Sequence, residues 1–338
     1  MNEGNHRVML AARPVGLPGP QVWEQTIADI GEPEPGQLLV EVQYLSLDPA
    51  MRGWMNDVRS YVPPVGLGEV MRAGGAGRVV ASRDDRFAVG DYVTGMTGVQ
   101  EYAVLDAGAV FRADLERAPL TRYLGVLGMT GMTAYFGLLD IGRPEPGQTV
   151  VVSGAAGAVG SVVGQIARIK GCRAIGIAGG PDKCEWLTGE LGFDAAIDYH
   201  AGIPAVAAGL REHARAGIDV YFDNVGGDIL DLAIARLARG ARVSLCGGIS
   251  QYNASEPVRG PSNYLSLVVN RARMEGFLVF DYAARFAEAA AQLAAWLADA
   301  RLIAREDIAD GGVAAFPETF LRLFRGENTG KLILRIRD

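Results

Sequence analysis

Residues 150–160 read VVVSGAAGAVG, an apolar run that leads directly into three glycines spaced three residues apart. The first glycine allows a tight turn, the second lets the backbone approach a pyrophosphate, and the third lets the following helix pack against the strand. N–H groups at the start of that helix attract the anion. The segment therefore predicts a dinucleotide-binding turn, with contacts expected from Gly154, Ala156, Gly157, Ala158, Val159 and Gly160.

This spacing, G-x-x-G-x-x-G, departs from the usual G-x-G-x-x-G pattern, and a glycine triplet alone is weak evidence for a nucleotide. Two alternatives stay open at this point. One is close packing in an α/β domain that binds no nucleotide, and the other is a methyltransferase, which can use such a turn.

The next expected strand, residues 174–178, decides between the two nicotinamide cofactors. An NAD site usually places Asp or Glu at the end of this strand to accept from the ribose 2′-OH. Here the strand ends in Gly179-Gly180-Pro181, and the cation Lys183 follows. We therefore predict NADPH, whose 2′-phosphate needs space and positive charge. Asp182 is the counter-evidence, and Lys183 in a solvated first helical turn is the alternative interpretation.

Strand-like and helix-like runs alternate on both sides of this region, which is typical of a parallel, doubly wound sheet. The expected strands are 148–153, 173–178, 195–199, 220–222 and 241–246, and the expected helices are 120–139, 159–170, 182–191, 203–215, 228–237 and 283–300.

The first third of the chain is β-rich instead. Short strand candidates at 37–43, 76–81, 92–94 and 101–105 are separated by Gly, Pro and Asp turns, a spacing that suits a partly open β-barrel. The last strand-like segment, residues 330–336, is expected to return to this first domain.

Composition limits the function classes. A chain of 338 residues favours two domains, and 49% hydrophobic with 21% charged residues is a soluble globular profile. Residues 1–14 lack the apolar segment of a secretory signal, and no run is long enough to cross a bilayer, so we expect a cytoplasmic protein without membrane association. The net charge of −7 argues against binding nucleic acid.

Metal-dependent chemistry is not indicated. Cys172, Cys184 and Cys246 lie far apart, and the three histidines form no ligand spacing, so we expect no zinc and cysteines that act as small buried hydrophobes. A zinc alcohol dehydrogenase is disfavoured by the missing G-H-E motif. A short-chain dehydrogenase needs Y-x-x-x-K, but Glu256 follows Tyr252 and Val268 follows Tyr264 at that spacing.

Several ordered motifs together carry a resemblance: YLSLDPAMRGWM, YVPPVGLGEVMRAG, SGAAGAVG, YFDNVGG, CGGISQYN, MEGFLVF and GENTGK. They resemble the zinc-independent medium-chain dehydrogenase/reductases, in the group of leukotriene B4 12-hydroxydehydrogenase, prostaglandin reductase and alkenal double-bond reductase. The resemblance spans nearly the whole chain. It implies a GroES-like catalytic domain, residues 1–122 completed by 306–338, and a Rossmann domain, residues 123–305, with NADPH in the cleft. It also favours a homodimer formed through Rossmann edge strands.

The resemblance also implies cofactor contacts, residue by residue. Lys183 and Tyr199 match positions that hold the adenosine ribose phosphate, while Gly248, Ser250 and Tyr252 fall in a loop beside the nicotinamide. The other matching positions are Asn224, Phe277, Leu278, Val279 and Asn328. Each has a plain structural alternative: a turn at Asn224, core packing in the strand matched by 277–279, and a half-exposed ring at Tyr199.

For this family the implied reaction is reduction of the C=C bond of an α,β-unsaturated ketone or aldehyde by hydride transfer to the β-carbon. A donor must then stabilise the charge that develops on the carbonyl oxygen. Tyr252 is the first candidate and Tyr61, at the implied substrate mouth, is the second. The chain departs from its relatives at Ala50, where many carry tyrosine. Oxidation of an allylic secondary alcohol and a non-catalytic nucleotide-binding sensor or scaffold stay open as alternatives.

Overall fold

The computed structural model describes residues 4–337 and divides the chain into two units. The central unit is Val126–Arg305, and the N-terminal unit comprises the described residues up to Gly125 together with those from Glu306 onward. Residues 1–3 of the N-terminal segment considered above lie outside the described part. Within 4–337, no helix combines the length and apolar composition that a membrane crossing requires.

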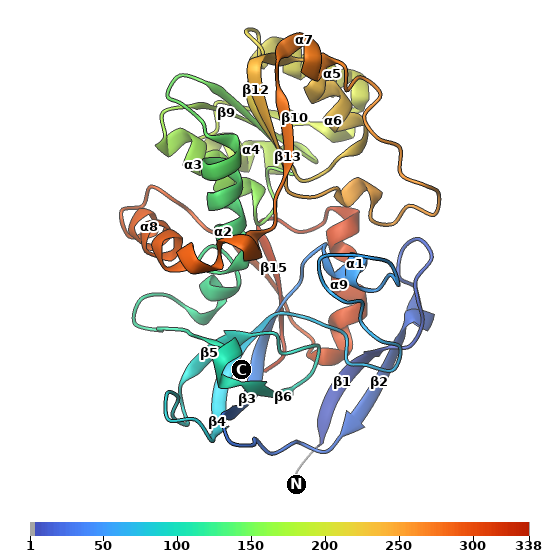
Figure 1. Ribbon diagram of the computed structural model, residues 1–338, viewed down its shortest axis with the longest axis vertical. Helices are drawn as coiled ribbons and strands as arrows, with labels where there is room; N and C mark the ends of the chain where they lie inside the picture. Colours follow the sequence, from blue (N-terminus) through green and yellow to red (C-terminus); the bar gives the residue numbers. More distant parts are fainter. Residues whose placement is uncertain (1–3, 338) are drawn as a thin grey trace. The chain divides into compact units, whose positions relative to one another are not determined.

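The central unit is built on a parallel sheet in the order β10-β9-β8-β11-β12-β13. Sequence order reverses between β8 and β11, and the carboxyl ends of strands at such a point are where α/β sheets bind ligands. The six-stranded order confirms the expected doubly wound sheet (Figure 1). The strands are β8 (Thr149–Ser153), β9 (Arg173–Ala178), β10 (Ala195–Asp198), β11 (Ile218–Asp223), β12 (Leu237–Leu245) and β13 (Arg273–Gly276).

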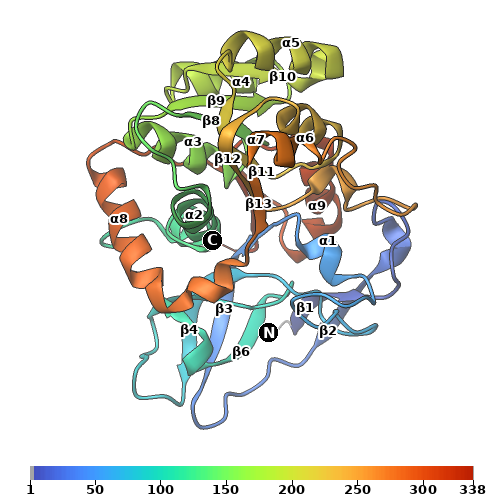
Figure 2. The same ribbon diagram turned by 45° about the horizontal axis from the view of Figure 1, so that its top comes forward.

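Helices cover both faces of this sheet and form a separate core on each (Figure 2). One core includes buried side chains of α2 (Met129–Phe136), α3 (Gly160–Ile169), α4 (Pro181–Gly189) and α8 (Phe286–Ala298). The other includes side chains of α5 (Ile203–His213), α6 (Gly227–Ile234) and α7 (Ser266–Asn270).

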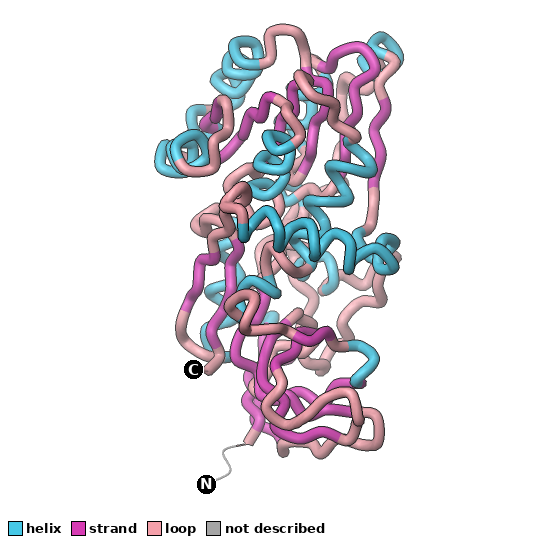
Figure 3. The backbone as a smooth tube through the Cα atoms, turned by 90° about the vertical axis from the view of Figure 1, so that its left-hand side faces the viewer, coloured by secondary structure: helices cyan, strands magenta, loops and turns pink. Residues whose placement is uncertain are grey.

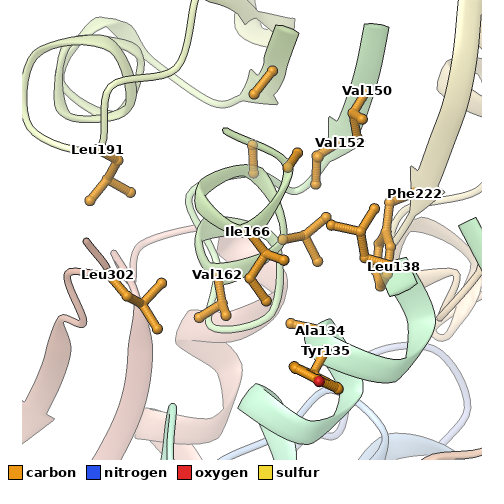
Figure 4. Close-up of a cluster of buried hydrophobic side chains, with 14 of the residues drawn as sticks. Ala134, Tyr135, Leu138, Val150, Val152, Val162, Ile166, Leu191, Phe222 and Leu302 are labelled. Carbon is orange, nitrogen blue, oxygen red and sulfur yellow. The ribbon is translucent and has the colours of Figure 1, made fainter. Parts of the chain in front are cut away.

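Alternate residues of β8 show why this strand has a continuous apolar run. Val150 and Val152 face the core that contains α3, whereas Val151 belongs to the core on the opposite face. In Figure 4, Val162 and Ile166 of α3 lie among the side chains of the first core. A strand buried on both faces needs a continuous apolar run, which is what residues 150–152 supply.

The N-terminal unit consists of a hairpin and a larger mixed sheet, whose strands are magenta in Figure 3. Strands β1 (Asn5–Leu10) and β2 (Trp23–Ala28) pair antiparallel. The larger sheet has the order β14-β15-β3-β4-β5-β7, with β6 on β3. Its members are β3 (Gln37–Ser46), β4 (Gly75–Ser82), β5 (Tyr92–Gly95), β6 (Tyr102–Asp106), β7 (Phe111–Arg112), β14 (Glu306–Ala309) and β15 (Lys331–Arg335), and two helices accompany them, α1 (Met51–Trp54) and α9 (Phe316–Arg325).

The C-terminal strand returns to the first unit as the sequence predicts. β15 pairs antiparallel with β3, which joins residues 331–335 to the N-terminal third of the chain. The expected β-rich first domain is therefore completed by the end of the chain.

Several expected bounds differ from the structure. The helix expected over 228–237 ends at Ile234, and the strand expected over 241–246 begins at Leu237. The segment 120–139 contains a 3-10 turn (Leu120–Leu124), then α2, then a π-helical turn (Gly137–Gly142), because Gly125 and Gly128 interrupt it with non-helical backbone angles. The helix expected to begin at residue 283 begins at Phe286, after a 3-10 turn over Val279–Arg285.

Candidate functional site

The glycine turn lies at the carboxyl end of β8, where strand order reverses. Gly154 has φ +59°, a left-handed conformation that favours glycine, and its carbonyl accepts from the N–H of Gly157 at 3.0 Å. A Cβ at Gly160, the first residue of α3, would lie 2.3 Å from the Gly154 oxygen. Only a chain without side chains at these points can make the turn, and the first N–H groups of α3 are placed to meet an anion. The turn therefore fits a pyrophosphate.

A buried carboxylate joins this turn to the neighbouring strand. Asp223, the last residue of β11, accepts from Ser153 Oγ at 2.8 Å, from Tyr221 Oη at 3.1 Å and from the backbone of the Val225-Gly226 turn. Asn224 in turn donates through Nδ2 to the Ser153 carbonyl at 2.7 Å. Burial raises the pKa of Asp223, an effect that these donors oppose. One acid thus holds the ends of β8 and β11 together.

Asn224 also positions the next loop. Its carbonyl accepts from the N–H of Ile249 at 3.1 Å, and the Val225 carbonyl accepts from Ser250 Oγ at 2.6 Å. The structure therefore brings Asn224, Gly248 and Ser250 together with the glycine turn. These contacts also agree with the alternative interpretation of Asn224 as a residue that only shapes the turn.

Tyr252 folds back over the glycines that precede it. Its phenol oxygen accepts from the N–H of Gly248 at 3.1 Å, and a Cβ at Gly247 would lie 2.7 Å from the same oxygen. The phenol oxygen is the acceptor in that contact, and a phenol can donate as well as accept. Tyr252 therefore belongs to the loop that Asn224 and Val225 anchor.

A second cluster lies at the end of β9, at the turn Gly179-Gly180. A Cβ at Gly179 would lie 2.7 Å from both Tyr199 Oη and His200 Nε2. The hydroxyl and the imidazole nitrogen therefore approach the space that a side chain at position 179 would occupy. Burial raises the pKa of Tyr199, which keeps its phenol protonated. Lys183 is half-buried in the first turn of α4, which follows directly. Gly179 and Gly180 directly follow β9, and the nearest acids in sequence and space are Asp182 in α4 and Asp198, which accepts from the Gly180 N–H at 2.7 Å.

The segment Phe277–Val279 corrects one expectation, because β13 ends at Gly276 and these residues follow it. The Phe277 ring packs edge-on to Phe222 with centroids 6.3 Å apart, and Val279 begins the 3-10 turn before α8. Leu278 is 37% exposed. Phe277 and Val279 pack against the core that contains α3, which agrees with their core-packing interpretation and leaves cofactor contact a prediction.

Tyr61, Asn328 and Ala50 lie in the N-terminal unit. Tyr61 is exposed, and its phenol oxygen accepts from Trp54 Nε1 at 3.0 Å. Asn328 donates through Nδ2 to the Gly330 carbonyl at 3.0 Å, ahead of β15. Ala50 is half-buried immediately before α1.

An ion pair between a buried lysine and a half-buried aspartate of the N-terminal unit was not anticipated from the sequence. Lys331 is 3% exposed and donates to Asp48 Oδ1 at 2.7 Å and to the Leu47 carbonyl at 2.8 Å. Asp48 precedes the Pro49-Ala50 step, so this pair fixes the start of α1 to β15. The D-P-A-M-R motif drew attention to Asp48, but its partner Lys331 lies 283 residues further along the chain.

The cysteines are unlike activated nucleophiles. Burial raises the pKa of Cys172 and Cys184, and it raises the pKa of Cys246 to about 12. Within residues 4–337, no three His, Cys, Asp or Glu side chains gather in the way that a metal ion requires.

Comparison with known proteins decides the family. Residues 6–113 match the model described as N-terminal domain of oxidoreductase, and residues 158–296 match the one described as zinc-binding dehydrogenase. The NADPH-dependent curcumin reductase of Escherichia coli is 42% identical over 98% of this chain and 97% of its own length. The chain belongs to the zinc-independent medium-chain dehydrogenase/reductases.

Two further members of this family extend the comparison. A 2-alkenal reductase (NADP(+)-dependent) of Nicotiana tabacum is 38% identical over 88% of this chain and 87% of its own length. The crystal structure of CurA in complex with NADPH from Vibrio vulnificus is 43% identical, has a TM-score of 0.93, and covers 98% of this chain and 99% of that one. The family suggested by the motifs is thus confirmed over the full length.

Proposed function

We propose that this protein reduces the C=C bond of α,β-unsaturated ketones and aldehydes with NADPH, by hydride transfer to the β-carbon. The observation that carries the proposal is the glycine turn at the β8–β11 switch point. Beside it, β9 runs into Gly179-Gly180, where the nearby Asp198 carboxylate is engaged by backbone N–H groups. Relatives named as curcumin reductase and 2-alkenal reductase support the substrate class, and the NADPH complex of CurA supports the cofactor.

The residues of the central unit fit that cofactor in distinct ways. Gly154, Gly157 and Gly160, with Ala156, Ala158 and Val159 between them, would hold the pyrophosphate through backbone N–H groups. Lys183 and Tyr199 would hold the 2′-phosphate. Asn224, Gly248, Ser250 and Phe277–Val279 would line the nicotinamide half, and Asn328 of the N-terminal unit is a further proposed contact.

When bound, NADPH supplies the hydride that the β-carbon accepts. The protein's own task is to stabilise the negative charge that then develops on the substrate carbonyl oxygen, until a proton from solvent reaches the α-carbon and completes the reduction. We propose that the Tyr252 phenol donates to this oxygen, directly or through a ribose hydroxyl, and that Tyr61 is the second candidate donor. A phenol suits this role because it is protonated at neutral pH.

The test is the loss of NADPH absorbance on addition of a panel of enones and enals. Tyr252→Phe should lower kcat by about 100- to 1000-fold, because one preformed donor to a developing oxyanion contributes on this scale. NADPH affinity should change little. Tyr44→Phe, which alters a tyrosine packed in the N-terminal unit, is the matched control. An unchanged kcat for Tyr252→Phe would remove this residue from the mechanism, and no turnover of any enone by the native enzyme would refute the function.

We further propose a cytoplasmic homodimer. The three cysteines are unpaired, which is usual in reducing compartments. The edge strand β13 follows a segment that exposes Tyr264, Leu265, Val268 and Val269, and Val268 is 73% exposed. Contiguous exposed apolar side chains beside an open strand edge are typical of a subunit interface.

A further inference from the structure

The turn at the end of β9 contains a further polar side chain, His200, beside the proposed phosphate ligands Lys183 and Tyr199. The Tyr199 and His200 rings meet edge to face, with centroids 4.7 Å apart and an interplanar angle of 85°. Their polar atoms, Tyr199 Oη and His200 Nε2, both approach the position where a Cβ of Gly179 would lie. Two hydrogen-bonding groups therefore converge at the point of a Rossmann sheet that receives the ribose 2′ substituent.

Asp198 fixes this convergence from behind. Its Oδ1 atom accepts from the backbone N–H of Gly180 at 2.7 Å and from that of His200 at 2.8 Å. The hydrogen bond from Gly180 is the main reason that the pKa of Asp198 is lowered. This carboxylate is engaged by backbone donors, so it locks the Gly179-Gly180 turn to the Tyr199-His200 turn.

We propose that His200 is a specificity-determining residue for the 2′-phosphate of NADPH, with its imidazole directed to the phosphate oxygens beside Tyr199 and Lys183. This inference rests on the proposed NADPH-dependent function. An uncharged imidazole offers a hydrogen bond, and a protonated one adds a charge-assisted contact to a phosphomonoester. NADH lacks the phosphate, so His200 contributes to the choice between the two cofactors.

The inference makes cofactor preference depend on pH. Histidine side chains change charge between about pH 5 and 8. The other ionisable groups near this turn are Asp198 behind it and Asp182, Lys183 and Cys184 on α4. Carboxyl and ammonium groups titrate outside the histidine range, and burial raises the pKa of Cys184 away from it. The phosphomonoester itself has a second pKa near ~6. The contribution of His200 must therefore be measured as a difference between native protein and variant at each pH.

The experiment measures NADPH and NADH dissociation constants by calorimetry, without enone, at about pH 6 and about pH 8.5, which bracket histidine titration. The proteins are the native enzyme, His200→Gln, His200→Lys and the control His213→Gln. His213 ends α5, about 15 Å along that helix from the turn. His200 is exposed, so its variants should fold.

We expect His200→Gln to weaken NADPH binding about three- to tenfold near pH 6, the scale of one charge-assisted contact at a partly exposed site, and less than about twofold near pH 8.5. NADH binding should not change. His200→Lys should bind NADPH more tightly than the native enzyme near pH 8.5, because lysine keeps its charge there. His213→Gln should match the native enzyme.

Two results would overturn the inference, and they differ from failure of the proposed function. A native preference for NADPH that His200→Gln leaves intact at both pH values refutes the role of His200 alone. An equal weakening of NADPH and NADH shows that His200 acts on the fold and not on the phosphate. If the native enzyme binds neither cofactor, the proposed function fails first.

Discussion

Asp223 illustrates how one side chain serves several loops. Its Oδ1 atom accepts from Ser153, Tyr221, Val225 and Gly226, and Oδ2 also accepts from Gly226. Burial raises the pKa of Asp223, so the folded state disfavours the ionised form relative to the unfolded chain. We infer that the acceptor oxygens of Asp223 contribute more to stability than its negative charge does.

The corresponding prediction separates acceptor from charge. Asp223→Ala removes every acceptor and should lower the free energy of unfolding by about 2–4 kcal/mol, because buried donors lose their partners. Asp223→Asn keeps one oxygen and should cost less than about half of that. Denaturant unfolding and NADPH titration measure both effects, and NADPH affinity should follow the same order.

The matched control is Asp231→Ala, which removes a half-buried carboxylate bonded to the exposed Ser262 in the same unit. We expect it to change stability by less than about 1 kcal/mol. If Asp223→Asn proved as damaging as Asp223→Ala, the charge would be the essential feature and this interpretation of the network would be wrong.

At the residue scale, the sequence led to Gly154, Lys183, Tyr199 and Asn224 because local pattern or motif points to each. It did not indicate the role of Asp223, although this residue stands inside FDNVGG. That role depends on β8 and β11 being neighbours, with Ser153 and Asp223 at the same edge. The convergence of His200 on Gly179 similarly needs the pairing of β9 with β10.

At the scale of elements, the junction of β8 with α3 leaves no room for a side chain at Gly160. A Cβ at Gly160 would meet only backbone: 2.3 Å from the Gly154 oxygen and 2.8 Å from the Ala155 Cα atom. No rotamer change can relieve such a clash, so the strand-to-helix turn itself would have to open.

Gly160→Ala should therefore lower the free energy of unfolding by at least about 1–3 kcal/mol, the usual cost of overpacking, and should weaken NADPH binding in parallel. Gly189→Ala is the control, since a Cβ at this last residue of α4 meets nothing within 4 Å. It should leave stability unchanged or raise it by up to about 1 kcal/mol through helix propensity. Equal stability and NADPH affinity in the two variants would show that the turn does not need glycine at position 160.

Most strands and helices could be predicted because their periodicity is local. The 3-10 and π-helical turns that interrupt the expected helices could not be predicted in this way. α8 begins at Phe286 because the preceding 3-10 turn is held by tertiary contacts, among them Tyr282 stacked on Phe136 with centroids 4.6 Å apart. Gly131 in α2 approaches the Val126 carbonyl so closely that a Cβ would lie 1.8 Å from it. The first contact joins residues far apart in the chain, and the second depends on how the backbone turns before α2, so neither follows from local periodicity.

At the scale of the whole molecule, the two units are built from different parts of the chain, and the end of the chain completes the first of them. This completion was predictable from the strand-like segment at 330–336. The partners of its residues were not: Lys331 is buried against Asp48, and β15 lies between β3 and the short strand β14. The exposed surface of the central unit also bears on the oligomeric state.

The proposed homodimer depends on the edge strand β13 and on α7 before it. β13 presents Arg273 and Glu275, so two copies paired antiparallel about Met274 would place opposite charges across the twofold axis. Val268 and Val269 are 73% and 69% exposed on α7. In a twofold interface, one substitution changes the contact twice.

Val268→Lys with Val269→Lys should therefore convert a dimer into a monomer, because four ammonium groups would be brought into an apolar contact and would repel one another. Light scattering after size-exclusion chromatography measures the mass, and NADPH titration checks that the central unit stays folded. Val89→Lys, at a residue 66% exposed in the N-terminal unit, is the control and should remain dimeric. A native protein that is monomeric at micromolar concentration, or a double variant that is still dimeric, would show that the β13 edge is not the interface.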